Sequence, residues 1–365
     1  MTAAEKAAKA VAADCLRLKE GERFLIVTNP GTEQEAVAQA LAEAGREQGA
    51  KVELQFQPIK NQGEYAEDYV LKAIASKPEA FASISSEKLG KDPQGLKNPM
   101  AAPDGKTYDH IFHYLLHGTK EMRAFWSPGI TMDAFSRTVA IDYSLMRRRA
   151  DLLSLVLDEA VSLHVTAPAG TDLWLGIQGR KTFRDDGDFS AFGSGGNLPA
   201  GEVFISPQLK TAEGTIVFDG SIADIAGVIL IETPIHCSLS GGYVLDVTGG
   251  AEAERLEAAS KKGMDMASGL VKQGKSGEDG LRYATNARNL GELGIGLNTE
   301  ARISGRMLED EKVYGTCHFA IGSNYDEDAP AMIHLDGLVK RPTIAAMMAD
   351  GTVRTLMKDG ELTLG

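Results

Sequence analysis

The first half of the chain alternates between helical and strand-like hydrophobic patterns. Residues 33–49 repeat apolar positions at helical spacing and close on a glycine, which is typical of a helix C-terminus. An apolar run at 23–29 and an alternating stretch at 51–58 flank this helix, and both predict strands. Such a β-α-β order predicts a mainly parallel sheet with helices on its faces. Further predicted elements are a helix at 64–76 and strands within 108–117 and at 138–142.

The pattern changes after a predicted helix at residues 144–162. Short alternating strands rich in glycine follow, interrupted by a helical stretch at 251–274. The fold class predicted is therefore α/β, with two domains. We expect an N-terminal α/β domain with a mainly parallel sheet at residues 1–165, and a C-terminal β-rich α+β domain at 166–365, which carries the candidate metal ligands.

Composition narrows the class of protein. A length of 365 residues suits about two domains. The formal net charge of -13 argues against a nucleic-acid partner, because such surfaces need clustered Lys and Arg. The N-terminus is patterned as an amphipathic helix and not as a signal peptide, and no apolar run is long enough to span a bilayer. Cytoplasmic localisation with no membrane partner is the expectation. The three cysteines have neither disulfide nor zinc-knuckle spacing.

Three further features favour structural roles. The glycine-rich stretch before Glu202 lacks the Lys-Ser/Thr of a phosphate loop, and no phosphate motif follows the first strand, so we predict no nucleotide cofactor. His110, His113 and His117 would share one face of a helix, as metal ligands do, but would divide between both faces of a strand. We favour the strand and a structural role. The acidic residues 309–311 are expected to form an exposed turn.

The candidate chemistry lies in the second half. Glu292 stands between glycines in a strand pattern, and such a local inconsistency is typical of a functional site. His334 and Asp336 are two residues apart, so on a strand their side chains point the same way. Histidine and carboxylate ligands suit Zn, Co, Mn or Fe. The full candidate set is Glu202, Glu292, His318, Tyr325, His334 and Asp336.

Four segments, "NLPAGEVFISP", "LGELGIG", "HFAIGSNY" and "IHLDG", together resemble the metalloaminopeptidase family of aminopeptidases T and S. The resemblance implies that the metal ligands are Glu202, Glu292, His318, His334 and Asp336, and that Glu292 lies between two metals. It also matches Tyr325 to the tyrosine of the family's third segment. Glu292 and Tyr325 are then the candidate catalytic residues, Glu292 carrying the proton to the leaving amine.

The implied function is hydrolysis of N-terminal residues from short peptides, by a water activated between two divalent ions such as Zn, Co or Mn. A small-molecule substrate is the other possibility, and both related families imply at least a homodimer. The segment "GELGIGLN" and the short gap between Tyr325 and His334 depart from the aminopeptidases.

The alternative is a likeness to the 2,5-dihydroxypyridine dioxygenases, which hold a single Fe(II) and cleave a hydroxylated aromatic ring. That family keeps the His-x-Asp pair. It carries histidine at the position of Glu292, serine at that of His318, and no glutamate at that of Glu202. Because this chain has the carboxylate-rich set, the sequence favours the hydrolase.

Overall fold

The predicted parallel sheet is present in the computed structural model, which describes residues 1–61, 63–272 and 279–364. Five strands, all parallel, follow the order β10-β6-β3-β1-β2. The interior strand β1 is buried on both faces after its first residue, as expected for a strand covered by helices. The strands are β1 (Arg23–Thr28), β2 (Lys51–Phe56), β3 (Ala80–Ile84), β6 (Arg123–Trp126) and β10 (Gly195–Asn197).

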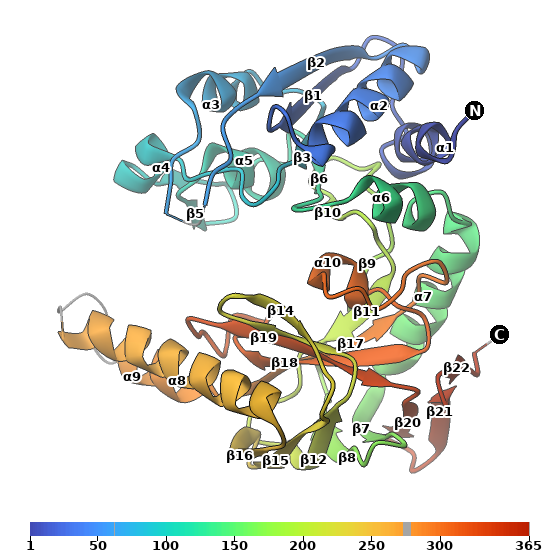
Figure 1. Cartoon of the computed structure of the whole chain (residues 1–365), viewed down its shortest axis with the longest axis vertical. Coiled ribbons are helices and arrows are strands. Elements are labelled where there is room, and N and C mark those ends of the chain that lie inside the picture. Colours follow the sequence, from blue (N-terminus) through green and yellow to red (C-terminus); the bar gives the residue numbers. More distant parts are fainter. Residues whose placement is uncertain (62, 273–278, 365) are drawn as a thin grey trace. The chain divides into compact units, whose positions relative to one another are not determined.

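Helices pack on this sheet through apolar faces (Figure 1). Helix α2 begins at the cap residue Thr32, whose hydroxyl accepts a hydrogen bond from the Glu35 amide, and buries Val37 and Leu41. Helix α2 spans Glu33–Glu47. The other helices here are α1 (Ala3–Ala10), α3 (Asp68–Ala75), α4 (Pro93–Lys97), α5 (Ile111–His113) and α6 (Met132–Thr138), with the π-helical turns η1 (Val11–Cys15) and η2 (Tyr114–Gly118). A small antiparallel ribbon is formed by β4 (Met100–Ala101) and β5 (Thr107–Tyr108).

Two strand predictions were wrong. Residues 111–118 are helical, because Phe112, Leu115 and Leu116 have helical spacing and together cover the sheet. The aromatic and branched residues that favoured a strand prediction pack against the sheet. Residues 138–142 connect two helices, and the strand of this region is β6, fifteen residues earlier.

A seven-stranded sheet occupies the second half of the chain, in the order β14-β13-β19-β18-β17-β11-β9. Its two central strands, β17 (Leu290–Gly296) and β18 (Thr316–Gly322), are buried at every position. Polar side chains on these strands are therefore removed from water. The other strands are β9 (Phe183–Asp185), β11 (Glu202–Ile205), β13 (Ser221–Asp224), β14 (Gly227–Leu230) and β19 (His334–Lys340).

A second sheet of eight strands follows the order β16-β15-β12-β8-β7-β20-β21-β22. Its alternating burial, as in β15 (Ile235–Ser240), leaves one face to solvent. Its other strands are β7 (Ala160–Thr166), β8 (Asp172–Gly176), β12 (Glu213–Phe218), β16 (Tyr243–Thr248), β20 (Thr343–Met348), β21 (Val353–Lys358) and β22 (Glu361–Leu362).

In the described part of the second half, four helices accompany these sheets, and α8 packs along α9 (Figure 1). They are α7 (Tyr143–Leu157), α8 (Ala251–Lys272), α9 (Asp279–Asn286) and α10 (Met307–Asp310). The last residues of the predicted 251–274 helix lie outside the described part of the chain. Among the residues that the structure describes, no helix is both long and apolar enough to cross a membrane.

The fold class is as predicted, an α/β unit with a parallel sheet and a β-rich α+β unit. The division between them differs from the predicted boundary at residue 165. The first unit comprises residues 1–143 and 185–200, and the second comprises 144–184 and 201–365. Residues 195–197 return to the first unit because β10 pairs with β6. Helix α7 belongs to the second unit apart from its first residue, and it ends at Leu157 where strand β7 soon begins.

Candidate metal centre

Strand register brings the five predicted ligands onto one face of the seven-stranded sheet. Glu292 on β17 pairs with Ala320 on β18, which pairs with Asp336 on β19. Directly paired residues share a face, and so do residues two apart on one strand, so His318 and His334 join this face. Glu202 on β11 joins it through its pairing with Gly296. All five belong to the second unit.

Small residues leave the space that these side chains fill. Gly294 pairs with His318, and a Cβ on Gly294 would lie 2.0 Å from the imidazole Nε2. No side chain can occupy that position while the ring keeps its place. Gly294, one of the glycines that made Glu292 anomalous in the sequence, thus leaves room for the His318 ring against the strand.

The donor atoms form two groups that share Glu292. In the first, His318 Nε2 lies 3.2 Å from Glu292 Oε1 and 3.4 Å from Glu202 Oε2. In the second, His334 Nε2 lies 3.2 Å from both Glu292 Oε2 and Asp336 Oδ1. Within each group the donor atoms lie within 4.8 Å of one another. Each oxygen of Glu292 therefore faces a different group.

Unsatisfied polar atoms support cation binding here. Glu202 Oε2, Glu292 Oε2 and Asp336 Oδ1 are buried and accept no hydrogen bond in the described structure. A buried carboxylate oxygen without a partner is costly, and a cation between such oxygens removes the cost. His334 Nδ1 lies 2.8 Å from the Ser323 carbonyl, which fixes the donor tautomer at Nδ1 and leaves Nε2 toward the carboxylates. The donors present thus fit divalent metal ions.

In the absence of metal ions, the imidazoles of this centre are protonated and neutralise its carboxylates. Burial opposes ionisation of Glu292, but its close contacts with the His318 and His334 imidazoles outweigh burial and lower its pKa to about 2. Burial acts against the charged form of His318, yet Glu292 and Glu202 raise its pKa to about 9. For His334 too burial is outweighed, here by Asp336 and Glu292, and its pKa is raised well above the ordinary value. Without metal, both imidazoles hold protons at neutral pH.

Lys312 is part of this centre and was not predicted from the sequence. Its fully buried ammonium lies 2.5 Å from Glu202 Oε1 and 2.9 Å from Glu311. Burial raises the pKa of Glu202 to about 8 in spite of this ammonium. Lys312 thus occupies one oxygen of Glu202 and leaves the other, Oε2, directed at His318. The only sequence signal was a lysine within an acidic run.

The acidic run itself was misassigned as an exposed turn. Asp310 is fully buried, and it accepts hydrogen bonds from the Ser221 hydroxyl at 2.6 Å and the Ser304 amide at 2.7 Å. Glu309 is buried as well, and accepts from the Arg302 amide. These carboxylates tie the loop before α10 to the sheet, which places Lys312 beside Glu202.

Tyr325 stands at the rim of the centre. Its ring lies edge-on to His334 with centroids 5.4 Å apart, and the side chain remains 51% exposed. Burial and the charges of Glu292 and Asp336 raise its pKa, so the phenol stays protonated and is a hydrogen-bond donor. Phe204 and Phe183 pack against it, with centroids 4.9 and 5.9 Å away. This aromatic cluster beside the donors was not predicted.

The remaining candidates lie elsewhere. His110, His113 and His117 are in the first unit, on and before the α5–η2 segment. His110 caps α5, as its Nδ1 accepts from the Phe112 amide at 3.0 Å. Cys317 is buried on the face of β18 opposite to His318, and burial raises the pKa of its thiol. All three cysteines are buried, and no two of them form a disulfide bond.

The raised pKa values predict how metal-free stability depends on pH. A group whose pKa is higher in the folded state stabilises the fold below its unfolded pKa and loses that contribution as pH rises through the folded value. For His318 this window runs from 6.5 to about 9, and for Glu202 from 4.5 to about 8. With EDTA present, the melting temperature should fall by about 5 °C or more between pH 6.5 and 9. Differential scanning calorimetry would measure it, and a flat profile would contradict the protonated centre.

Gly294→Ala should displace the His318 ring and weaken metal retention. We expect a loss of about 10- to 100-fold in affinity, as for other changes that reorient a ligand. Competition with a fluorescent chelator measures this affinity. Gly269→Ala on α8 is the matched control, because a Cβ there meets nothing within 4 Å. Equal metal affinity in the two variants would show that the glycine is not needed to hold the ring.

Comparisons with known proteins complete this picture. The family model described as NicX, 2,5-dihydroxypyridine 5,6-dioxygenase, matches residues 131–345, more than half of the chain. No curated protein matches the sequence. Among solved structures, a 2,5-dihydroxypyridine dioxygenase from Pseudomonas putida KT2440 is similar at a TM-score of 0.71 and 18% identity, over 99% of this chain and 97% of that one.

A second similar structure is wild-type AmpT from Thermus thermophilus. It gives a TM-score of 0.66 at 17% identity, over 99% of both chains. At such identities the two structures establish the shared two-domain fold and do not assign an activity. Both structural neighbours carry the names of enzymes.

Proposed function

The chain belongs to the NicX family of 2,5-dihydroxypyridine 5,6-dioxygenases, and from the donor set that it carries within that family we propose that it is a metal-dependent hydrolase of the aminopeptidase type. The observation that supports this best is the orientation of the Glu292 carboxylate, because its two oxygens face two separate groups of donor atoms. A carboxylate that serves two groups is what a pair of ions requires.

Five residues would hold the ions. Glu202, Glu292 and His318 form one shell, and Glu292, His334 and Asp336 the other. Two divalent ions bound there would supply an activated water and Lewis acidity. Three carboxylates leave a pair of dications with net positive charge, which favours an anionic transition state. Zn, Co and Mn all suit such a mixture of nitrogen and oxygen ligands.

The protein's own groups supply positioning and proton transfer. Glu292 would carry a proton to the leaving amine, since a carboxylate at the reaction centre is in reach of the attacking water. The Tyr325 hydroxyl would donate a hydrogen bond to the developing oxyanion. Phe183, Phe204 and Tyr325 offer an apolar surface beside His334, so the substrate we propose is a short peptide or small amide with an apolar or aromatic side chain.

A second candidate function is supported by separate observations. Family membership favours a mononuclear Fe(II) dioxygenase acting on a hydroxylated aromatic ring. The Lys312 ammonium already neutralises one oxygen of Glu202, which lessens the need for a cation in the first group. One iron held by Glu292, His334 and Asp336 would then suffice, although this set has one histidine where the usual oxygenase triad has two.

Metal analysis of the wild type and of a Glu202→Gln variant distinguishes the hydrolase from the dioxygenase. The hydrolase should contain two ions per chain, release p-nitroaniline from leucine p-nitroanilide, and lose one ion and most activity in the variant. The dioxygenase should contain one iron, consume oxygen with 2,5-dihydroxypyridine, and keep its iron in the variant. Two ions with no amide hydrolysis across apolar aminoacyl anilides would count against the hydrolase.

A further inference from the structure

A cavity lies in the first unit, and the proposed function makes no use of it. It encloses about 570 Å³, within the usual size of small-molecule sites. The cavity adjoins the carboxyl ends of strands β3 and β6, lined by Ser83 near the end of one and Trp126 at the end of the other. In open parallel sheets, ligands bind beyond these ends, next to the point where strand order reverses. Here the order reverses between β1 and β3.

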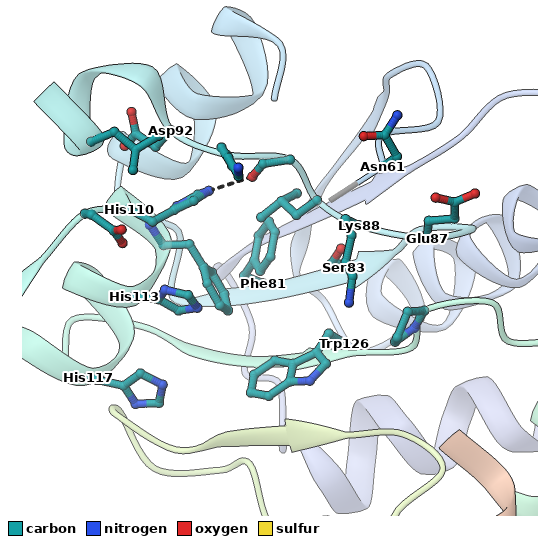
Figure 2. Close-up of a pocket in the computed structure, with 17 residues that line it drawn as sticks. Asn61, Phe81, Ser83, Glu87, Lys88, Asp92, His110, His113, His117 and Trp126 are labelled. Atoms are coloured by element: carbon teal, nitrogen blue, oxygen red, sulfur yellow. Dashed lines mark hydrogen bonds between the residues drawn. The ribbon is translucent and has the colours of Figure 1, made fainter. Parts of the chain in front are cut away.

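Aromatic rings form the floor and one wall. Phe81 and Phe112 lie with centroids 5.2 Å apart, and Phe112 meets Trp126 edge to face at 6.0 Å (Figure 2). Such an arrangement presents both ring faces and ring edges to a guest, which suits a planar aromatic molecule. Leu89 and Leu96 extend the apolar lining.

Charged residues of both signs line the cavity, and Lys91 and Asp109 are among them. The positive charge of Lys88 extends toward the aromatic floor (Figure 2). Lys88 lines the cavity, and its side chain reaches past Ser83 toward Trp126, whereas the Glu87 carboxylate points away (Figure 2). Within the described residues, the Lys88 ammonium has no ion-pair partner. Asp92 also lines the cavity, but backbone amides take both of its oxygens: Gln94 and Gly95 donate to Oδ1, and Ile111 donates to Oδ2.

Two histidines supply neutral polar groups. His113 and His117 line the cavity with stacked rings, 6.1 Å between centroids, and neither ring has a hydrogen bond in the described structure. Burial and the neighbouring histidines lower the pKa of His113 to about 4, so it is neutral at physiological pH. His110 differs, because its two nitrogens already bond to the Gly90 carbonyl and the Phe112 amide, and it serves to shape the wall.

We infer that this cavity binds a planar aromatic carboxylic acid, with the ring system against Phe81, Phe112 and Trp126, and the carboxylate at the Lys88 ammonium. His113 and His117 would give hydrogen bonds to further polar groups on the ring. This site is distinct in its residues from the metal centre, and it takes a ligand whether the metal centre holds ions or not.

Calorimetric titration of the full chain with 2-naphthoate and with the uncharged 2-naphthamide tests the charge. We expect the acid to bind at least tenfold more tightly than the amide. Lys88→Met should remove that advantage and leave amide binding unchanged. Because Lys88 is exposed, the variant should fold. Lys97→Met, which removes an exposed lysine of α4 outside the cavity, is the matched control and should bind like the wild type.

Two measurements locate the ligand. The chain has two tryptophans, so a Trp174→Phe variant leaves the indole N–H signal of Trp126 alone in the NMR spectrum, and naphthoate should shift it. Binding should also persist in Glu292→Gln protein treated with EDTA. The inference is overturned if naphthoate does not bind, if amide and acid bind equally, if Lys88→Met has no effect, or if binding disappears with the metal.

Discussion

Glu292→Gln is expected to lose both metal ions and to lower hydrolytic activity by about a thousandfold. Each oxygen of this carboxylate faces one imidazole at 3.2 Å, so the residue is common to both donor groups. Glutamine keeps the shape but removes the charge, and it turns an N–H₂ group toward one of the ions. Loss of about 4 kcal/mol of transition-state stabilisation corresponds to that factor, within the range for metal-ion catalysis.

Elemental mass spectrometry and steady-state kinetics on the purified variant would measure both effects. Glu232→Gln is the control, since it makes the same chemical change at an exposed turn residue and should retain metal and activity. Folding is checked by circular dichroism. A Glu292→Gln protein that keeps two ions and full activity would rule out this centre, and His334→Ala provides an independent second test of the same kind.

Lys312→Met is expected to destabilise the metal-free protein by about 3 kcal/mol, the lower end of the range for breaking a buried ion pair. The substitution removes an ammonium that is fully buried between Glu202 and Glu311, and leaves an apolar side chain of similar length. We expect the lower end of this range because Glu202 can take up a proton when the ammonium is absent. Its pKa is already raised.

Urea unfolding in the presence of EDTA measures the loss, and two comparisons identify its cause. A divalent ion should recover most of the stability, because it neutralises Glu202. The double variant Lys312→Met/Glu202→Gln should recover it without metal, because position 202 then carries no charge that needs the ammonium. If the double variant is no more stable than Lys312→Met, the cost comes from lost packing and the ion pair is not responsible.

Much of this protein could be predicted from local patterns. The apolar run of β1, the alternating pattern of β2 and the helical spacing of α2 predicted the parallel sheet. Burial on both faces gives β1 its nearly continuous hydrophobic run. Glycines around Glu292 and the His-x-Asp pair marked the strands that carry the donors. These signals lie within a few residues of one another, which is why one sequence suffices to detect them.

Other features depend on residues far apart in the chain. The helix at residues 111–118 has strand-like composition, and only its packing on the sheet decides its conformation. Residues 185–200 join the first unit because β10 pairs with β6 across some seventy positions. Lys312 looked like part of an exposed acidic turn, and its place beside Glu202 is set by the hydrogen bonds of Asp310.

The sequence by itself determined which side chains could bind a cation, because ligand chemistry belongs to the residue type and strand alternation fixes which neighbours share a face. Only the tertiary structure decided that Glu202, Glu292 and the two imidazoles meet, with one oxygen of Glu292 toward each group. The reason is physical: pairing between strands sets the register, and register is a property of contacts between distant segments that no single segment encodes.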